Sequence, residues 1–168
     1  TICQIESRTG KDVITPLNPK VLFGISPQGT LSGNEKQSAD VQTWGQTAGY
    51  CDYLLPQLYF GFQNSTAPFA ETAAFWAEQV TCPDVSLWIG ICTYKIGQQD
   101  TWAGDGMTEW QTDSQVVSKE LELLCNMDGI DGAAIYDYAS TFQPESSVSE
   151  ILSSERDAIQ VLLQTPAN

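Results

Sequence analysis

The chain has 168 residues, with 21 acidic against 7 basic side chains and no histidine, which gives a formal net charge of −14. Such an acidic surface repels phosphate backbones and anionic membranes. We therefore expect no nucleic-acid partner. The lack of histidine excludes Ser-His-Asp triads, Cys-His pairs and histidine-ligated metals, and leaves acid–base chemistry to carboxylates, lysine and tyrosine.

The five cysteines are odd in number and show no C-x-x-C spacing, so they signal neither a zinc site nor a complete disulfide framework. Cys51 and Cys92 fall in or beside predicted core strands, and we interpret both as small buried hydrophobic residues. We expect no cofactor, although a metal held by carboxylates alone stays open. No apolar run reaches the length of a membrane span, so no membrane-spanning segment is expected.

The length suits one domain and is short of the roughly 250 residues of a full (β/α)8 barrel. The chain also starts at Thr1 without a methionine. We therefore expect residues 1–168 to form a single domain that is a fragment of a larger catalytic domain.

The first third of the chain predicts a helix end, a strand and a helix. Residues 2–14 carry a weak amphipathic pattern that stops before Pro19, because the residue preceding proline disfavours the helical region. A strand is predicted over Val21–Ile25, followed by a loop over 26–34 that is rich in Gly and Ser. A helix then runs from its N-cap Ser38 to Ala48.

The middle of the chain repeats this order. The almost unbroken apolar run Asp52–Phe60 predicts a strand that is buried on both faces. Apolar residues then recur at helical spacing and predict a helix over Pro68–Val80. Val85–Thr93 is the third predicted strand.

The segment Ile96–Gln111 is the longest stretch without periodicity, and it carries Trp102 and Trp110 among several glycines. Loops of this length in compact domains are usually functional or disordered. Two tryptophans in a polar loop fit a platform on which sugar rings stack. They fit equally well a lid that is tucked onto the body of the protein by its indoles.

The last part of the chain predicts two more helices and a strand. Thr112 and Gln115 match a capping box for a helix that ends at Asp128-Gly129. Gly132–Asp137 is the fourth predicted buried strand, and a closing helix spans 148–163 with a break near Ser153-Ser154. Strand and helix thus alternate four times, which predicts an α/β fold with parallel strands and right-handed crossovers. Periodicity alone does not decide between a small four-stranded open sheet and half of an eight-stranded barrel.

Three motifs in order, Phe23–Gly29 (FGISPQG), Asp52–Tyr59 (DYLLPQLY) and Leu87–Gly97 (LWIGICTYKIG), together with the Gly132 strand, resemble strand motifs of the bacterial glycosyl hydrolase-like family 10. The resemblance extends over 18–140. It implies a (β/α)8 barrel of which strands 5 to 8 are present here, while the amino-terminal half is missing. It also implies a parent glycoside hydrolase, with peptidoglycan glycan strands among the family's substrates and export to the cell envelope. We expect the fragment alone to be inactive.

The resemblance further implies which strand-end residues face a carbohydrate, namely Ser26, Gln57, Tyr59, Tyr94 and Lys95. An amide such as Gln57 both donates and accepts, as sugar hydroxyls require, or else it satisfies the strand-end backbone. Tyr59 stands where the family commonly has Trp. The lysine binds a substrate carboxylate or holds a catalytic acid ionised, or it is simply solvated.

Two further aromatic residues, Trp102 and Tyr138, complete the predicted substrate-binding set. Tyr138 follows the last predicted strand and Trp102 lies in the 96–111 segment.

Glycoside hydrolysis usually needs two carboxyl groups, about 5 to 5.5 Å apart for retention or about 6.5 to 9.5 Å apart for inversion. Asp137, at the end of the last predicted strand, is the candidate here, although the family more often has an uncharged residue near this place. The loop residues Asp100, Asp105 and Glu109 are weaker candidates. Asp52 and Asp131 precede their strands, so they belong to the opposite end of a barrel, which serves stability.

Two interpretations therefore stand. One is the carboxyl-terminal half of a glycoside hydrolase barrel, and the other is a non-catalytic carbohydrate-binding or structural α/β domain without an acid pair. Half a barrel leaves sheet edges and an apolar face uncovered. We therefore expect a homodimer, or terminal helices that cover the exposed face, in addition to the missing half and a carbohydrate as partners.

Overall fold

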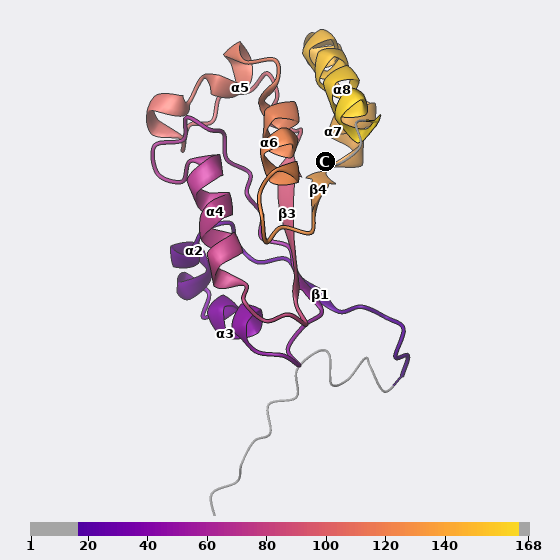
Figure 1. Ribbon diagram of the computed structural model, residues 1–168. Helices are drawn as coiled ribbons and strands as arrows, with labels where there is room; N and C mark the ends of the chain where they lie inside the picture. Colours follow the sequence, from indigo (N-terminus) through magenta and orange to yellow (C-terminus); the bar gives the residue numbers. More distant parts are fainter. Residues whose placement is uncertain (1–16, 165–168) are drawn as a thin grey trace, which may run out of the picture.

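The computed structural model describes residues 17–164, in which four parallel strands alternate with helices in one sheet (Figure 1). The strands are β1 (Gly24–Ile25), β2 (Tyr53–Leu54), β3 (Ser86–Cys92) and β4 (Gly132–Tyr136), and they lie in the order β1-β2-β3-β4. The predicted α/β fold is confirmed. This sequential order is compatible with part of a (β/α)8 barrel, because crossovers of one hand then stay on one face of the sheet. The helix end predicted over 2–14 lies outside the described residues.

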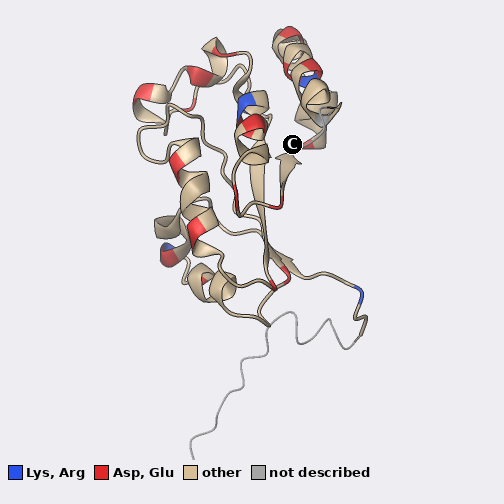
Figure 2. Ribbon diagram, in the orientation of Figure 1, with Lys and Arg blue, Asp and Glu red and all other residues tan. Residues whose placement is uncertain are grey.

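Nine helical segments connect or follow the strands in residues 17–164: α2 (Leu31–Lys36), α3 (Val41–Gln46), α4 (Phe69–Gln79), η1 (Gly104–Gly106), α5 (Glu109–Thr112), α6 (Val116–Cys125), α7 (Tyr138–Phe142), η2 (Ser146–Val148) and α8 (Ser149–Gln164). Among the described helices, none has the length and apolar character needed to cross a membrane. Figure 2 shows acidic residues at many positions of these helices and basic residues at few.

The two faces of the sheet differ. On the covered face, Leu87, Ile89 and Ile91 of β3 are at most 1% exposed, and α4 and α6 pack against this strand. On the other face, which we call the open face, Trp88 is 39% exposed. The predicted strand 85–93 and helix 68–80 are confirmed to within a residue or two. The long buried strand forces its alternate residues under the helices, which is why periodicity locates it well.

The first two strands are shorter than predicted. Only two residues of the expected strand 52–60 form a regular ladder, and pairing resumes beyond Pro56 as single bridges from Gln57 to Gln28 and Gly90. Proline has no backbone N–H to donate, so it interrupts a ladder inside a sheet. The backbone nevertheless stays in the sheet, since the Leu58 N–H donates to the carbonyl of Gly90 at 2.8 Å.

The helix predicted over 38–48 was wrong in its start. Within this range the helix is α3, which is capped by Asp40, while α2, capped by Thr30, begins inside the predicted loop 26–34; each cap side chain accepts a backbone N–H. Ser38 has a φ of 56° and lies between them. Thr30 and Asp40 are both common N-cap types, so the residue types alone did not decide which of the candidates starts a helix.

The predicted capping box at Thr112 and Gln115 was also wrong. Gln115 is the N-cap of α6 and makes no side-chain capping bond. The buried carboxylate of Glu155 on α8 instead accepts the N–H groups of Val117 and Ser118, both at 2.9 Å. A distant helix thus satisfies the start of α6, and α8 continues through the expected break at 153–154 because this contact and buried Leu152 hold it.

The fourth strand is not buried as expected. Ile135 is 37% exposed and Tyr136 is 54% exposed, because β4 is the edge of the sheet in the described residues. The segment 96–111 is likewise not a plain loop, since it contains η1 and the first turn of α5.

The amino-terminal ends of the strands are held by two aspartates, as predicted for the stability end. Asp52 accepts the N–H of Phe23 at 2.7 Å, and Asp131 accepts the N–H of Leu87 at 2.8 Å. Each aspartate precedes one strand, and its carboxylate accepts a backbone N–H from the neighbouring strand that comes before it in the chain. Cys51 and Cys92 are both 0% exposed, which confirms their interpretation as buried residues.

Candidate functional site

Three tyrosines meet at the carboxyl-terminal end of the sheet. Tyr59 stacks on Tyr136 with ring centroids 5.8 Å apart, and Tyr94 meets both rings edge-on at 5.9 and 6.1 Å. They follow β2, follow β3 and end β4, respectively. The parallel order of the strands brings together residues that are far apart in the sequence, and it builds one aromatic wall.

Beside this wall lies a cavity of about 520 Å³, which we call the sheet hollow. Ser26, Gln57, Tyr59, Tyr94 and Tyr136 line it, so four of the predicted substrate-binding residues come together here. Gln57 donates through Nε2 to the Ser26 hydroxyl at 3.1 Å, and that hydroxyl donates to the Leu55 carbonyl at 2.9 Å. One side of the Gln57 amide is therefore fixed within the sheet end.

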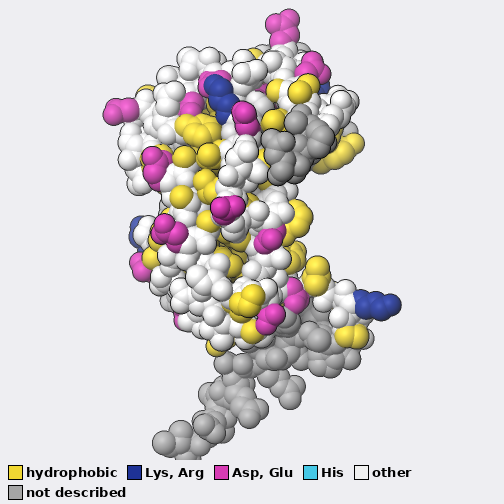
Figure 3. Space-filling view, in the orientation of Figure 1, with side chains coloured by type: hydrophobic (Ala, Val, Ile, Leu, Met, Phe, Trp, Pro, Cys, Tyr) yellow, Lys and Arg dark blue, Asp and Glu magenta, His cyan; other side chains and the backbone are white. Residues whose placement is uncertain are grey.

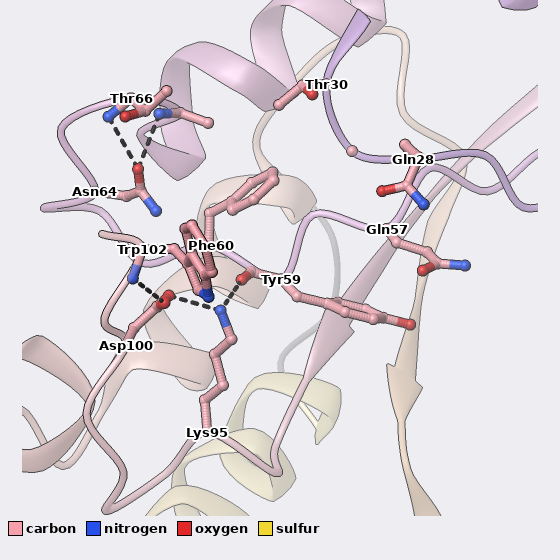
Figure 4. A pocket seen from close by; sticks show the side chains of 12 residues that line it. Gln28, Thr30, Gln57, Tyr59, Phe60, Asn64, Thr66, Lys95, Asp100 and Trp102 are labelled. Carbon is pink, nitrogen blue, oxygen red and sulfur yellow. Dashed lines mark hydrogen bonds and ion pairs between the residues drawn. The ribbon is translucent and has the colours of Figure 1, made fainter. Parts of the chain in front are cut away.

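A second cavity of about 440 Å³, the loop hollow, shares Gln57 and Tyr59 with the first. The side chains of Phe60, Asn64 and Trp102 surround it (Figure 4). Oδ1 of Asn64 accepts the N–H groups of Thr66 and Ala67 at 3.0 and 2.9 Å, which leaves the amide nitrogen directed into the cavity.

Lys95 is paired in the structure, and its side chain is 19% exposed. Its Nζ lies 2.6 Å from Oδ2 of Asp100 and 2.7 Å from the Tyr59 carbonyl oxygen (Figure 4). The other oxygen of Asp100 accepts the N–H of Trp102 at 3.2 Å. The ammonium group thus ties the end of the second strand to the loop that carries the exposed indole.

The two tryptophans of the 96–111 segment have opposite surroundings. Trp110 is 1% exposed, whereas Trp102 is 87% exposed at the rim of the loop hollow. The indole of Trp110 therefore anchors the segment to the body of the protein, whereas that of Trp102 is presented to solvent and its role as a sugar platform stays a prediction. Glu109 is also buried, and it accepts the N–H groups of Phe62 and Gln63 at 3.0 and 2.9 Å.

Asp137 caps the short helix α7 and forms a reciprocal capping box with Ser140. The backbone N–H of Ser140, followed by its hydroxyl, holds the pKa of Asp137 below its ordinary value. A general acid of a glycosidase needs a raised pKa, so this carboxylate is suited to act only in its ionised form. Tyr138 is 70% exposed and packs on Phe142 at 5.0 Å, and it lines neither the sheet hollow nor the loop hollow.

The hydroxyl groups of Tyr59 and Tyr94 are neutral near pH 7. Burial raises the pKa of Tyr94 to about 12 and also raises the pKa of Tyr59, with smaller contributions from neighbours that include Cys92. Such phenols donate and accept hydrogen bonds but do not act as bases. The site is therefore equipped for binding hydroxyl-rich rings.

Sequence reasoning missed two residues of the site. Tyr136 stands beside Asp137 and completes the aromatic wall, and its place at a strand end was the available signal. Asn64 lay in a polar stretch that gave no sign of its burial. No cluster of three or more Cys, Asp and Glu side chains within 17–164 could hold a metal ion.

The family model of glycosyl hydrolase-like 10 matches residues 8–104, which is more than half of the chain. The chain belongs to the glycosyl hydrolase-like 10 family. The matched range includes β1 to β3 and reaches η1, so it covers most of the residues that line both hollows of this family member.

Relatives agree with this assignment. Glycosyl hydrolase DigH of Escherichia coli (strain K12) is 28% identical over 159 residues, which cover 83% of this chain and 35% of DigH. Glycosyl hydrolase YngK of Bacillus subtilis (strain 168) is 32% identical over 99 residues, or 49% of this chain and 19% of YngK. The chain thus spans about a third of DigH and about a fifth of YngK.

Proposed function

We propose that this chain supplies the carbohydrate-binding part of a glycoside hydrolase site that acts on a polysaccharide, with the glycan strands of peptidoglycan as the substrate class. The carrying observation is the convergence of Tyr59, Tyr94 and Tyr136 beside Gln57 at the carboxyl ends of parallel strands. Aromatic rings stack on the apolar faces of sugars, while the amide and the neutral phenols bind their hydroxyls. Active sites of parallel α/β enzymes lie at this end of the sheet.

The catalytic carboxylates of this proposal come mainly from outside the chain. Residues 1–168 form half of a (β/α)8 barrel, and the amino-terminal half of the barrel is its partner. Two observations support this division. The chain aligns with 35% of DigH, and one face of its sheet is left open by the described helices. Alone, the chain binds sugar and does not hydrolyse it, because an acid and its counterpart have to face each other across the bond.

Asp137 is the carboxylate of this chain proposed to take part. With its lowered pKa it is ionised at neutral pH, so it would stabilise positive charge on the sugar ring or act as base, while the general acid would come from the other half. Trp102 and Tyr138 are proposed as stacking surfaces at the rim. Lys95 takes a supporting role, because its ammonium is already paired.

A non-catalytic carbohydrate-binding domain is the second candidate function. One observation favours it: among the described residues that line the sheet and loop hollows, the single carboxylate is Asp100, which is paired with Lys95. Such a lining binds sugar but offers no free acid or base.

Calorimetric titration of the protein with chitohexaose tests the proposal. We expect binding that falls about tenfold or more in Gln57→Ala, since the loss of a hydrogen-bonding side chain costs about 1.5 kcal/mol. Gln46→Ala, which changes an exposed glutamine at the end of α3, is the matched control and should bind normally. Equal affinity in both variants would remove the assigned site.

The two candidate functions are separated by a second measurement. Release of reducing ends from peptidoglycan glycan strands should be undetectable with the chain alone and should appear when an amino-terminal barrel half is joined to it. In that joined protein, Asp137→Asn should lower turnover while sugar binding stays unchanged. If the joined protein binds glycan strands and never cleaves them, the non-catalytic function stands.

A further inference from the structure

We propose that α8 is a pH-sensitive latch, which stays docked on α6 while the buried side chain of Glu120 carries a proton and lifts away as that proton is lost. Figure 1 shows α8 as the last helix of the described chain, and it packs on α6. Within residues 17–164, no residue of α8 lines the sheet hollow or the loop hollow. The latch is therefore separate from the proposed sugar site and does not depend on it.

The contact between the two helices is centred on one buried carboxylate. Glu155 on α8 is 1% exposed, and its two oxygens accept the N–H groups of Val117 and Ser118 in the first turn of α6, both at 2.9 Å. Leu152 lies three residues earlier on the same face of α8 and is also 1% exposed. A terminal helix that is held mainly by one neighbour can open at a lower free energy than the whole domain.

Glu120 lies beside this contact on α6. It is 0% exposed, and neither of its carboxylate oxygens has a hydrogen-bond partner among the described residues. Side chains of a helix lean toward its amino-terminal end, so the carboxyl group of Glu120 is directed toward the turn whose N–H groups Glu155 binds. Of the charged groups around Glu120, Glu155 acts on it most strongly. Two acidic groups are therefore enclosed where α8 meets α6.

The other groups that act on Glu120 do not offset its charge. Glu109 on α5 repels a negative charge there, and Lys95 after β3 attracts it but is already paired with Asp100. The thiol of Cys92, at the end of β3, also lies within electrostatic range of Glu120, and burial raises the pKa of this thiol above its ordinary range, so it is uncharged.

The remaining titratable residues on the elements around α6 point elsewhere. Tyr136 of β4 lines the sheet hollow on the open face. The charged residues of α4, of α6 with its preceding turn, and of α8 that are not named above are all at least partly exposed: Glu71, Glu78, Asp113, Lys119, Glu122, Glu150, Arg156 and Asp157. Glu120 is thus the carboxyl group of α6 that depends on the docked helix for its burial.

Loss of the proton places a negative charge without a partner inside this contact. Such a charge is costly away from water, and it repels the Glu155 carboxylate. Lifting of α8 relieves both costs, because water then reaches Glu120 and Glu155 moves away. The whole chain carries a net charge of −14, and few basic side chains stand on the face that Figure 3 draws, so the surface offers little positive charge in compensation.

The pKa of Glu120 sets the direction of the switch. Burial, followed by the charges of Glu155 and Glu109, raises this pKa well above its ordinary value while α8 is docked. Once α8 has lifted, the pKa returns toward the ordinary value of about 4.3. Docking is therefore strongest below about pH 4.3, and the opening constant of α8 rises by about tenfold per pH unit from there up to the raised pKa.

Opening of the latch reaches the segment after β3. Leu152 of α8 and Val148 of η2 line a cavity of about 240 Å³ together with Tyr94 and Ile96. Tyr94 also belongs to the aromatic wall at the sheet hollow. The docked helix thus closes a space next to one residue of the site, and its release opens that space to water.

Hydrogen–deuterium exchange with mass spectrometry tests the latch in the full chain. The exchange rates of the α8 amides are compared between the unmodified chain and Glu120→Gln at each pH from 4 to 8, so that the intrinsic pH dependence of exchange cancels. We expect the ratio of the rates, unmodified chain over variant, to rise by about tenfold per pH unit and then to level off. A ratio that stays constant with pH overturns the latch.

Two further variants separate the proton from a merely structural role. Glu150→Gln removes an exposed carboxylate of α8 and should keep the pH profile of the unmodified chain. Leu152→Ala removes buried methyl groups from the same contact, so it should speed the exchange of α8 by one factor at every pH. A factor that changes with pH in either variant would overturn the assignment to Glu120.

Trypsin shows whether the opening is confined to α8. Arg156 is the one Lys or Arg residue in α8, so cleavage after it reports the opening of this helix. At pH 8 we expect cleavage after Arg156 to precede cleavage after Lys95 in the unmodified chain, and to slow by about tenfold or more in Glu120→Gln. Equal rates of cleavage at Arg156 and Lys95 would mean that the whole domain opens together, and the latch would fall.

Discussion

The two faces of the central sheet differ in burial, and two neighbouring residues of β3 show the difference. Ile89 lies under the helices and is 0% exposed, whereas Trp88 points to the open face and is 39% exposed. Both are large apolar side chains in one strand. The covered face is a buried core, while on the open face Trp88 is exposed and Cys92, four residues further along β3 at an alternate position, is buried. The difference shows which face of the sheet its own helices cover and which face they leave open in the described residues.

The sheet hollow lies where the open face meets the carboxyl ends of the strands. Tyr59, Tyr94 and Tyr136 stand there partly exposed. The covered face has its own irregularity, because Glu120 of α6 is 0% exposed and neither carboxylate oxygen has a hydrogen-bond partner within 17–164. Thus polar groups are presented on one side of the sheet and enclosed on the other.

The largest effect on stability should come from truncating a side chain on the covered face. Ile89→Ala is expected to lower the free energy of unfolding by about 2–5 kcal/mol, because it removes buried methyl groups and leaves a cavity. Ile135→Ala on the edge strand is the matched change at a side chain that is 37% exposed, and it should cost about 1 kcal/mol. Urea denaturation measures both. Equal losses of unfolding free energy in the two variants would contradict this dependence on burial.

The second effect concerns Glu120 and pH. Burial, and then the carboxylates of Glu155 on α8 and Glu109 on α5, raise its pKa well above the ordinary value, while Lys95 after β3 opposes this in part. The folded protein therefore holds a proton that the unfolded chain releases. Its contribution to stability is full below the unfolded pKa and is lost as pH rises toward the folded pKa, by about 1.4 kcal/mol per pH unit.

Glu120→Gln isolates this contribution, since a neutral amide mimics the protonated carboxyl group. The variant should gain stability relative to the unmodified chain as the pH is raised from 4 to 8, measured by urea denaturation at each pH. Glu122→Gln, an exposed neighbour on the same helix, should run parallel to the unmodified chain. A constant offset for Glu120→Gln across this range would contradict a bound proton.

The smallest effect on stability is expected on the open face, where the consequence is association. We predict that the chain forms a homodimer through this face, and that Trp88→Lys makes it monomeric with a change in unfolding free energy below about 1 kcal/mol. Sedimentation velocity over a range of concentrations measures this. Lys119→Ala, on the surface of α6, serves as a control that should stay dimeric. A stable monomer of the unmodified chain at all concentrations would defeat the prediction.

Local periodicity predicted the parts of this fold in which one face is buried under another element. The strand over 85–93 and the helix over 68–80 were found close to their expected bounds, because burial requires apolar residues at fixed spacing. Helix starts were predicted poorly. Ser38, Thr30 and Asp40 are all N-cap types, and only the packing of the chain chose among them.

Part of the site could be predicted in the same way. Ser26, Gln57, Tyr59 and Tyr94 follow apolar runs, and parallel strands bring such positions to one end of the sheet. The pairing of Lys95 with Asp100 could not be predicted, since it depends on the path of the loop that brings the carboxylate back to the strand end. Tyr136 also stands at a strand end, but its contact with the other two rings is a tertiary feature that the sequence does not record.

The sequence by itself determined the alternation of strands and helices, the polar and aromatic strand ends and the membership of the family, because these are written in residue types and their spacing. Only the tertiary structure decided which tryptophan is buried, which carboxylate caps α6 and where the hollows join. Those outcomes depend on contacts between residues far apart in the chain, such as Glu155 with Val117 and Gln57 with Gly29, and no local pattern records them.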